Sequence, residues 1–353
     1  MLVRLAWFAP TPDDVALELA RRHDVDHYDA RNAHDFVWKH FRTPYDLTVF
    51  ELADSPAHAF VWPYLFHYPG VAILRATSLQ EHRTRGLNRQ WRRPHLRAER
   101  AFGGPDLMRA PLLASRLVVV NDEPAARVLA AEHPDAAVRI LPVGVRPASA
   151  EPGRELRFRS TTTRADVIEA AAQRARDVGT PIPLTPGLDG LRETDVVIVL
   201  EWPPTGAMPV DALRAMGAGL PTIVFETEAV AAWPALDPQT WQPRGYVNSG
   251  EPIAISIDPR DEEHSLMRCL RRLSADPALR SRLGDAARDW VREHANAESA
   301  AREWEPVLAD AIHRPPVLAP ADLPPHLVDD GTATAQSVLQ EFGVSVDLFN
   351  REW

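Results

Sequence analysis

The sequence has very little cysteine, because Cys269 is the single one among 353 residues. One thiol cannot form an intramolecular disulfide, and it cannot supply the paired cysteines of a zinc site. It stands in a stretch that the pattern predicts as helical, Glu262 to Ser274. We therefore expect Cys269 to be a small core residue, and we expect neither thiol chemistry nor a disulfide-stabilised fold.

The sequence also lacks long hydrophobic runs and an excess of positive charge. No window holds the roughly 20 apolar residues of a membrane span, and the first apolar run is too short for a signal peptide. The formal net charge of -10 argues against a general nucleic-acid binder. A cytoplasmic, soluble protein is expected, with peripheral membrane contact left open. The sequence shows no clear Asp/His metal cluster, which is compatible with an enzyme that needs no metal and also with no catalysis. No metal and no cofactor is expected.

Apolar residues make up 45% of the chain and charged residues 25%, a globular balance whose length predicts two domains. Short apolar runs alternate with amphipathic stretches, which indicates an α/β fold with a parallel sheet buried on both faces. The strands predicted in the first half are Val3–Phe8, Val25–Tyr28, Leu47–Glu51, Ala72–Arg75, Leu117–Asn121 and Val138–Leu141. The second half is expected to contain strands at Leu156–Arg159, Val196–Leu200 and Pro221–Phe225, and helices from Asp261 to Ile312.

Proline and glycine punctuate the chain at residues 142–153, PVGVRPASAEPG, which is typical of a linker. The sequence thus predicts an N-terminal domain at 1–147 and a C-terminal domain at 148–312. The second domain looks short, with little room between Gly153 and Thr194 for a strand, helix and strand. Residues 313–353 begin as a proline-rich tail, with a short helix expected at Thr334–Phe342. This tail is interpreted as a strap packed on the body or as a docking segment.

Three runs carry a resemblance to a known family. They are YDLTVFELADSPAHAFVWPYLFHYPGVAILR from Tyr45, DALRAMGAGLPTIVF from Asp211, and the helical run IDPRDEEHSLMRCLRRLSADPALRSRLGDAARDWVRE from Ile257. Together they resemble bacterial GT-B glycosyltransferases of the large retaining family-four type. The resemblance implies two Rossmann-like domains facing across a cleft, with a helical C-terminus. It also implies an acceptor on the first domain and a nucleoside-diphosphate sugar on the second, held without a metal by helix N-termini and basic side chains.

The donor motif of that family departs from its usual form in this chain. Its two glutamates, spaced E-x7-E, are replaced by Gly206 and Arg214, and arginine cannot accept hydrogen bonds from sugar hydroxyls. Arg214 could instead meet a phosphate, or it could be an exposed helix residue. Glu201 follows the strongest strand of the second half and is the candidate substitute acid. Asp211 at the start of the next helix is explained by N-capping.

The loops expected to bind phosphate also depart from the usual form of that family. The loop APTPDD after the first strand is rich in proline and acid, and is unfit to cradle a phosphate. The sequence STTTR at 160–164 is predicted as a polar loop, with Thr161, Thr163 and Arg164 forming an anion-binding nest at a helix start. Helix capping by Thr162 or Thr163 is the alternative.

Candidate acceptor residues follow the third predicted strand. Ser55 and His58 are expected to contact a hydroxyl, with His58 orienting it or accepting its proton, or else simply packing as a core histidine. Beyond the fourth strand, residues 75–100 hold eight arginines, Arg75 and Arg83 among them. Such a cluster suits a phosphorylated, lipid-linked or other anionic acceptor, or it is a solvated face.

The resemblance therefore implies a glycosyltransferase that moves a sugar from a nucleoside-diphosphate sugar to a hydroxyl or saccharide acceptor, with retention and without a metal. His58 and Glu201 are the candidate catalytic residues. The missing carboxylates keep a second hypothesis open, in which the chain is a non-catalytic GT-B homologue that binds an anionic partner.

Overall fold

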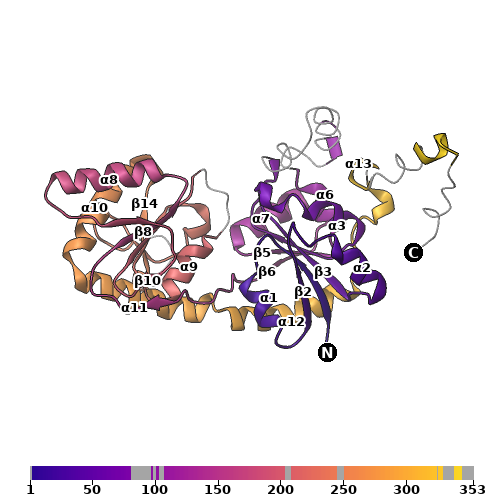
Figure 1. Ribbon diagram of the computed structural model, residues 1–353, viewed down its shortest axis with the longest axis horizontal. Coiled ribbons are helices and arrows are strands. Elements are labelled where there is room, and N and C mark those ends of the chain that lie inside the picture. The colour runs from indigo at the N-terminus through magenta and orange to yellow at the C-terminus, as the bar shows by residue number, and fades with distance from the viewer. Residues whose placement is uncertain are drawn as a thin grey trace. The chain divides into compact units, whose positions relative to one another are not determined.

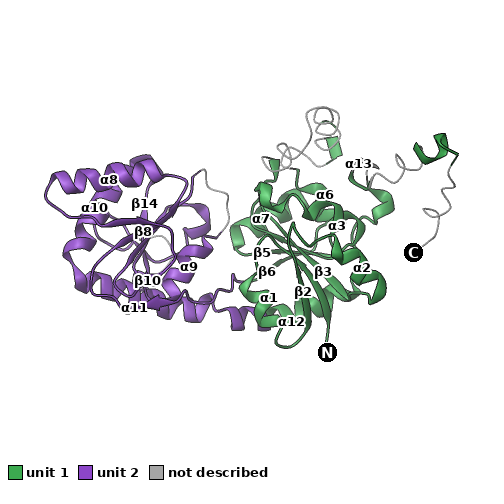
Figure 2. Cartoon of the chain, in the orientation of Figure 1, with its two compact units in different colours: residues 1–141, 303–353 green, residues 142–302 purple. Residues whose placement is uncertain are grey.

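A computed structural model of the chain describes residues 2–80, 97, 101–102, 107–202, 208–244, 250–323, 325–328 and 338–343. The chain forms two compact units (Figure 2). Unit 1 comprises residues 1–141 and 303–353, and unit 2 comprises residues 142–302. Each unit is built around its own parallel sheet, so the chain has the mixed α/β class that its sequence predicts.

The sheet of unit 1 is parallel, in the order β2-β1-β3-β4-β5-β6 (Figure 1). Its strands are β1 (Arg4–Phe8), β2 (Asp24–Tyr28), β3 (Leu47–Leu52), β4 (Val71–Leu74), β5 (Leu117–Val120) and β6 (Val138–Ile140). Strands β4 and β5 are buried at every residue, as expected for a sheet covered on both faces. The six strands predicted for the first half are confirmed, each within one residue at either end.

Helices cover both faces of this sheet. They are α1 (Asp14–Leu19), α2 (Asp35–Arg42), α3 (Val61–His67), α6 (Arg109–Ala114), α7 (Glu123–Glu132) and α12 (Ala297–His313). One face packs on α3 and α6 through a cluster that includes Phe50, Phe66 and Leu112. On the other face the ring of Trp7 lies 5.3 Å from that of Trp304 in α12. The last helix of the second predicted domain therefore completes the core of unit 1.

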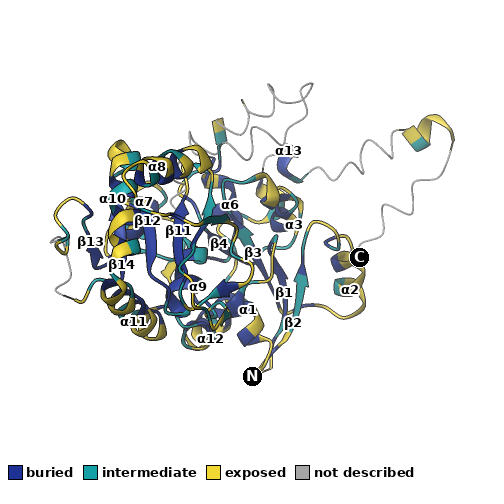
Figure 3. Cartoon of the chain, turned by 60° about the vertical axis from the view of Figure 1, so that its left-hand side comes forward, coloured by how far each residue is buried: buried dark blue, intermediate teal, exposed yellow. Residues whose placement is uncertain are grey.

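Unit 2 repeats the arrangement with a sheet in the order β13-β14-β12-β11-β8-β9. Its strands are β8 (Phe158–Thr162), β9 (Leu184–Pro186), β11 (Val196–Leu200), β12 (Thr222–Phe225), β13 (Ala235–Leu236) and β14 (Ala254–Ile257). A separate pair joins β7 (Ala150–Glu151), in the predicted linker, to β10 (Leu191–Arg192). Strands β11, β12 and β14 are buried throughout, and appear dark blue in Figure 3.

Two helix pairs sandwich the second sheet. They are α8 (Ala165–Asp177) with α10 (Glu262–Ala275), and α9 (Val210–Gly217) with α11 (Pro277–His294). Cys269 is fully buried in the cluster formed by α8 and α10, and burial raises the pKa of its thiol. Its interpretation as a core residue is confirmed.

Three sequence expectations differ from the structure. The loop predicted at residues 160–163 is largely wrong. Strand β8 continues through Thr162 and pairs with β11 along its whole length. The strand, helix and strand that seemed not to fit between Gly153 and Thr194 are present as β8, α8 and β9. The units divide at 141/142, and residues 303–312 belong to unit 1, because the apolar face of α12 packs on the first sheet.

The described residues of the tail between 314 and 328 pack on unit 1. The amide of Leu318 donates to the carbonyl of Leu113 at 2.9 Å, and Leu323 and Leu327 are buried in the same core cluster as α3. The guanidinium of Arg116 donates to the carbonyl of Ile312 at 2.8 Å, at the end of α12. Residues up to 328 are thus a strap, as one of the two interpretations expects. The predicted helix at Thr334–Phe342 lies partly outside the described residues, and residues 338–341 of it are helical.

Candidate functional site

Each sheet has a switch point, where the connections from two adjacent strands lead to opposite sides of the sheet. In open α/β folds, ligands bind at the carboxyl ends of the strands at this point. In unit 1 it lies between β1 and β3, and in unit 2 between β8 and β11. The carboxyl ends of the strands there are followed by polar and charged side chains in both units. These two edges are described separately below.

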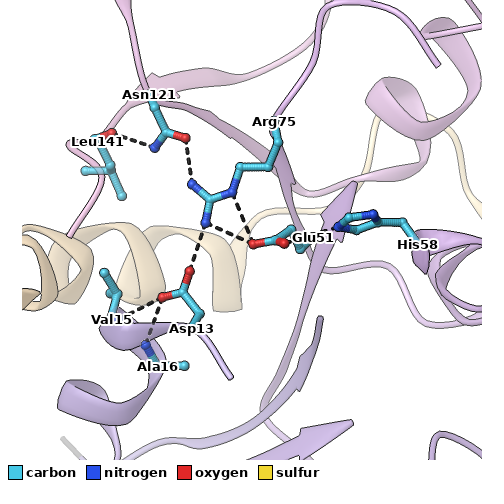
Figure 4. A network of polar contacts seen from close by, with 8 residues as sticks. All are labelled: Asp13, Val15, Ala16, Glu51, His58, Arg75, Asn121 and Leu141. Atoms are coloured by element: carbon cyan, nitrogen blue, oxygen red, sulfur yellow. Dashed lines mark hydrogen bonds and ion pairs between the residues drawn. The ribbon is translucent and has the colours of Figure 1, made fainter. Parts of the chain in front are cut away.

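At the edge of unit 1, Arg75 directly follows β4 and joins Asp13 beyond β1, Glu51 near the end of β3 and Asn121 after β5 (Figure 4). Its Nη2 donates to Oδ2 of Asp13 at 2.8 Å and to Oε2 of Glu51 at 2.9 Å, and its Nε donates to the same Glu51 oxygen at 3.1 Å. Its Nη1 donates to Oδ1 of Asn121 at 2.7 Å, and Asn121 donates to the carbonyl of Leu141. We call Asp13, Glu51, His58, Arg75 and Asn121 the arginine network.

The arginine network buries two carboxylates and only one guanidinium. The side chains of Asp13 and Glu51 are 12% and 15% exposed, and they share one guanidinium. Burial raises the pKa of Glu51, but the attraction of Arg75 and the bond from His58 outweigh it and hold that pKa at about 2. Burial and the neighbouring Glu51 raise the pKa of Asp13 against the pull of Arg75. Glu51 is accordingly the carboxylate that stays ionised to the lowest pH.

Asp13 is also the N-cap of helix α1. Its Oδ1 accepts the backbone amides of Val15 and Ala16, which caps α1, while Oδ2 receives Arg75. The place at the start of α1 where a nucleotide-binding fold would hold a phosphate is therefore taken by a carboxylate of the chain itself. The interpretation of APTPDD as unfit for phosphate agrees with this geometry.

His58 lies in the short 3-10 helix η1 (Pro56–His58), and its residue is 9% exposed. Its Nε2 lies 3.2 Å from Oε1 of Glu51, while no partner is found for its buried Nδ1. Because an ionised carboxylate only accepts, Nε2 carries a proton. In the neutral imidazole, Nδ1 is then the nitrogen that can accept a proton.

The other acceptor candidates have different surroundings. The hydroxyl of Ser55 accepts the amide of Ala57 at 3.3 Å and begins η1, so it positions His58 in the chain. Arg75 is buried and directed at internal carboxylates, which is not the acceptor contact that the sequence predicts. Arg83 and most of the arginine-rich segment lie outside the described residues.

At the edge of unit 2, the hydroxyls that follow β8 tie this strand to β11. The Thr162 hydroxyl bonds the carbonyl of Leu200 and accepts the amide of Arg164 at 2.7 Å. The Thr163 hydroxyl donates to the carbonyl of Trp202 at 2.9 Å and accepts its amide at 3.0 Å. Thr161 lies within β8 opposite Val199. The threonines thus position the strand ends, and neither Thr162 nor Thr163 is the N-cap of α8.

The N-cap of α8 is Arg164, and no side-chain oxygen bonds the first turn. Its guanidinium pairs with Glu262 at the start of α10 and lies 3.7 Å from Asp166. The 13-residue helix α8 therefore presents its positive end at the switch point of unit 2, next to a cation. This contrasts with α1, whose N-terminus is filled by Asp13.

Glu201 directly follows β11 and remains solvent-exposed. Partial desolvation by the surrounding protein, and then repulsion from Asp211 in the first turn of α9, raise the pKa of Glu201. Asp211 has no side-chain bond to the amides of α9, whose N-cap is Pro209, so the expected capping role is wrong. Arg214 is half-buried in the last turn of α9, and Gly206 lies outside the described residues.

Replacing Glu201 with glutamine should stabilise the chain at neutral pH. A carboxyl whose folded pKa is raised costs stability when it ionises, so the cost is present above that pKa and absent below the unfolded value. Solvent screening at this exposed side chain keeps the expected rise in Tm to about 1–2 °C. Thermal unfolding at neutral pH and at pH below about 4 measures it, and the difference should vanish in acid. A rise that persists in acid would contradict this origin, and Glu193→Gln is the control.

Neither edge contains a metal site among the residues that the structure describes, since no group of three His, Cys, Asp or Glu side chains converges there. None of the described helices is long and apolar enough to cross a membrane.

Sequence reasoning missed Glu51 and Asn121, and it considered Asp13 as part of the acidic loop APTPDD. All three carry a recognisable signal, because each is a polar residue at or just beyond the carboxyl end of a buried strand. The sequence does not reveal that a single arginine after β4 would bind two of them.

The two three-layer units with this strand order form a GT-B fold. Sucrose-phosphate synthase from Thermosynechococcus elongatus is similar in structure, with a TM-score of 0.57 and 14% identity over 87% of this chain and 98% of that one. S. aureus TarM is also similar in structure, with a TM-score of 0.51 and 10% identity. The match covers 77% of this chain and 58% of TarM. No protein-family model and no curated protein matches the sequence. The likeness establishes the fold.

Proposed function

We propose that the protein transfers a sugar from a nucleoside-diphosphate sugar to a hydroxyl group of an acceptor. The GT-B fold, shared with sucrose-phosphate synthase and with TarM, supports this reaction class. The TarM structure holds UDP and α-GlcNAc-glycerol. The sequence runs from Tyr45, Asp211 and Ile257, which resemble retaining family-four enzymes, support it independently.

The contrast between the two helix N-termini carries the proposal. The start of α1 already holds the carboxylate of Asp13, whereas the start of α8 has no side-chain cap and is flanked by Arg164. A diphosphate needs amide donors and a cation, so the donor belongs on unit 2. Thr161 and Thr163 line that strand end, Glu201 would accept hydrogen bonds from sugar hydroxyls, and Gly206 and Arg214 remain proposed donor contacts.

The acceptor belongs at the arginine network of unit 1, where Ser55 and His58 follow β3. His58 would take the proton of the acceptor hydroxyl on Nδ1, while Glu51 holds Nε2–H. The hydroxyl oxygen then bonds to the anomeric carbon on the face from which the diphosphate departs. The bond from that carbon to the diphosphate breaks, which releases the nucleoside diphosphate and retains the configuration. Because Nδ1 of His58 is buried, the groups that cover it must move before an acceptor hydroxyl can reach this nitrogen.

Two finer features are proposed from the resemblance. Retention of the anomeric configuration is one, and NMR of the first-formed product reports it directly. Independence from metal is the other, because Arg164 and the α8 N-terminus would neutralise the leaving diphosphate. Activity that survives thorough chelation supports it, and activity restored only by a divalent cation contradicts it.

The decisive measurement is thermal unfolding of the full chain with a panel of UDP-, GDP- and TDP-sugars. A ligand that binds only the native state stabilises it by about 2.7 kcal/mol at one hundred times its Kd. One donor class should therefore raise Tm by several degrees.

Arg164→Ala should weaken this rise, whereas Arg292→Ala on the exposed face of α11 should leave it unchanged. If no nucleotide sugar shifts Tm at millimolar concentration, donor binding is ruled out, and a non-catalytic binding protein is then the better account. Release of nucleoside diphosphate that depends on an added hydroxyl acceptor separates transfer from binding.

A further inference from the structure

Helix α2 presents its large apolar side chains to solvent. Of its eight residues only Phe36 is buried, while Val37, Trp38 and Phe41 are 45%, 67% and 54% exposed. Three of the twelve exposed large hydrophobic side chains among the described residues therefore occur within five consecutive positions. Elsewhere such residues are scattered, and Figure 3 shows strands in dark blue beneath helices with yellow outer faces. A cluster of this kind marks an interaction surface.

The inner face of α2 fixes the helix firmly, so its outer face cannot turn inward. The Phe36 ring meets the rings of Phe8 and Tyr68 at 5.1 Å and 4.9 Å, and it stacks on Tyr45 at 5.5 Å. His40 also stacks on Tyr45. At about 100° per residue, Val37, Trp38 and Phe41 lie within an arc of about 100° on the opposite side. The apolar stripe is thus held outward by an aromatic core.

A cation borders this stripe at the carboxyl end of the helix. Arg42 is exposed, and its guanidinium lies 5.9 Å from the centre of the Trp38 ring. Lys39 lies on another side of the helix, where its Nζ is 3.3 Å from Asp26 and 5.5 Å from the centre of the Tyr28 ring. Asp35 is the single acid of the helix, at its first turn. An exposed tryptophan beside arginine, with phenylalanine next to it, matches the chemistry of the boundary between lipid headgroups and acyl chains.

The size of the stripe distinguishes a membrane from a protein partner. A stable protein interface buries about 800 Å² on each side, far more than three side chains of an eight-residue helix supply. A bilayer needs no matching surface, because each inserted apolar side chain contributes separately.

We propose that α2 is a membrane-surface contact, in which Trp38, Phe41 and Val37 enter the headgroup region and Arg42 meets lipid phosphates. This contact is independent of the transfer reaction and needs no spanning segment. Its strength is modest, since one short helix contributes few inserted groups. It gives the open expectation of peripheral membrane contact a definite place in the chain.

Flotation of the full chain with two kinds of vesicle tests the proposal, one of phosphatidylcholine alone and one that also contains phosphatidylglycerol. The chain should bind both, and more strongly the anionic one. Trp38→Ala combined with Phe41→Ala should lower binding to both by about tenfold or more. Arg42→Glu should weaken binding mainly to the anionic vesicles.

Matched controls keep the result specific to α2. Phe342→Ala removes an aromatic side chain that is 77% exposed, and Arg127→Glu with Arg292→Glu reverses two exposed charges on other helices. These variants should bind as the unaltered chain does, apart from a small general charge effect. All substituted side chains are exposed, and circular dichroism confirms folding.

Three outcomes would overturn the proposal. One is no binding of the unaltered chain to either vesicle, and another is undiminished binding of the Trp38/Phe41 variant. The third is self-association in sedimentation equilibrium that the same variant abolishes, with no vesicle binding, which would assign the stripe to a second copy of the chain.

Discussion

Replacing Arg75 with methionine should destabilise unit 1 by about 3–5 kcal/mol at neutral pH. The guanidinium is the shared partner of Asp13 and Glu51, whose side chains are 12% and 15% exposed. Methionine matches much of its volume but leaves two buried carboxylates without their cation, and Asn121 without its donor. Urea unfolding followed by circular dichroism measures the loss.

The pH dependence of this loss identifies its cause. In the unaltered chain the pKa of Glu51 is lowered to about 2, so its stabilising contribution is present above pH 4.5 and disappears as the pH falls toward 2. Without Arg75 both carboxyls should take up protons at higher pH, and the deficit of the variant should shrink on acidification. Arg31→Met removes a guanidinium that is 91% exposed and paired with Asp29, and should change stability by less than about 0.5 kcal/mol. A deficit that stays constant with pH would indicate lost packing rather than unpaired charge.

Replacing His58 with asparagine should lower kcat about 10²- to 10⁴-fold, the range for loss of a general base. The proposed proton acceptor is Nδ1, which asparagine does not reproduce as a base. Because His58 contributes no donor contact, the Tm rise caused by the nucleotide sugar should be unchanged. Release of nucleoside diphosphate with an established acceptor provides the rate, and thermal unfolding provides donor binding.

Two further variants separate catalysis from folding. His67→Asn alters an exposed histidine at the end of α3 and should keep full activity. Glu51→Gln retains a side chain that can still meet Nε2 but removes the negative charge, so kcat should fall with less effect on KM. Unchanged kcat in the His58→Asn variant would show that His58 only packs against Glu51.

Much of the fold could be predicted because strand signals are local. Runs such as Leu117–Val120 and Val196–Leu200 are apolar throughout, and only a sheet covered on both faces accommodates them. Strand β14 was missed because it is only four residues long and the polar Ser256 interrupts its apolar run. The loop predicted after Arg159 was wrong because pairing with β11 overrides the polar character of Ser160 and Thr162.

The candidate site divides in the same way. His58 and Glu201 were predictable as polar residues after buried strands, since chain position alone places them at a sheet edge. Their partners were not predictable. Glu51 lies only seven residues from His58 in the chain. Arg75, whose positive charge lowers the pKa of Glu51, lies 24 residues away, after β4.

The amino-acid sequence by itself determined the α/β class, the six strands of unit 1, the burial of Cys269 and the unsuitability of APTPDD for phosphate. Each depends on a local pattern of apolar, proline or acidic residues that has one favourable conformation. Only the tertiary structure decided that Arg75 serves Asp13 and Glu51, that α12 returns to unit 1, and that the outer face of α2 stays uncovered. These depend on which distant segments share a sheet edge or a face, and strand order and packing settle that after the local elements have formed.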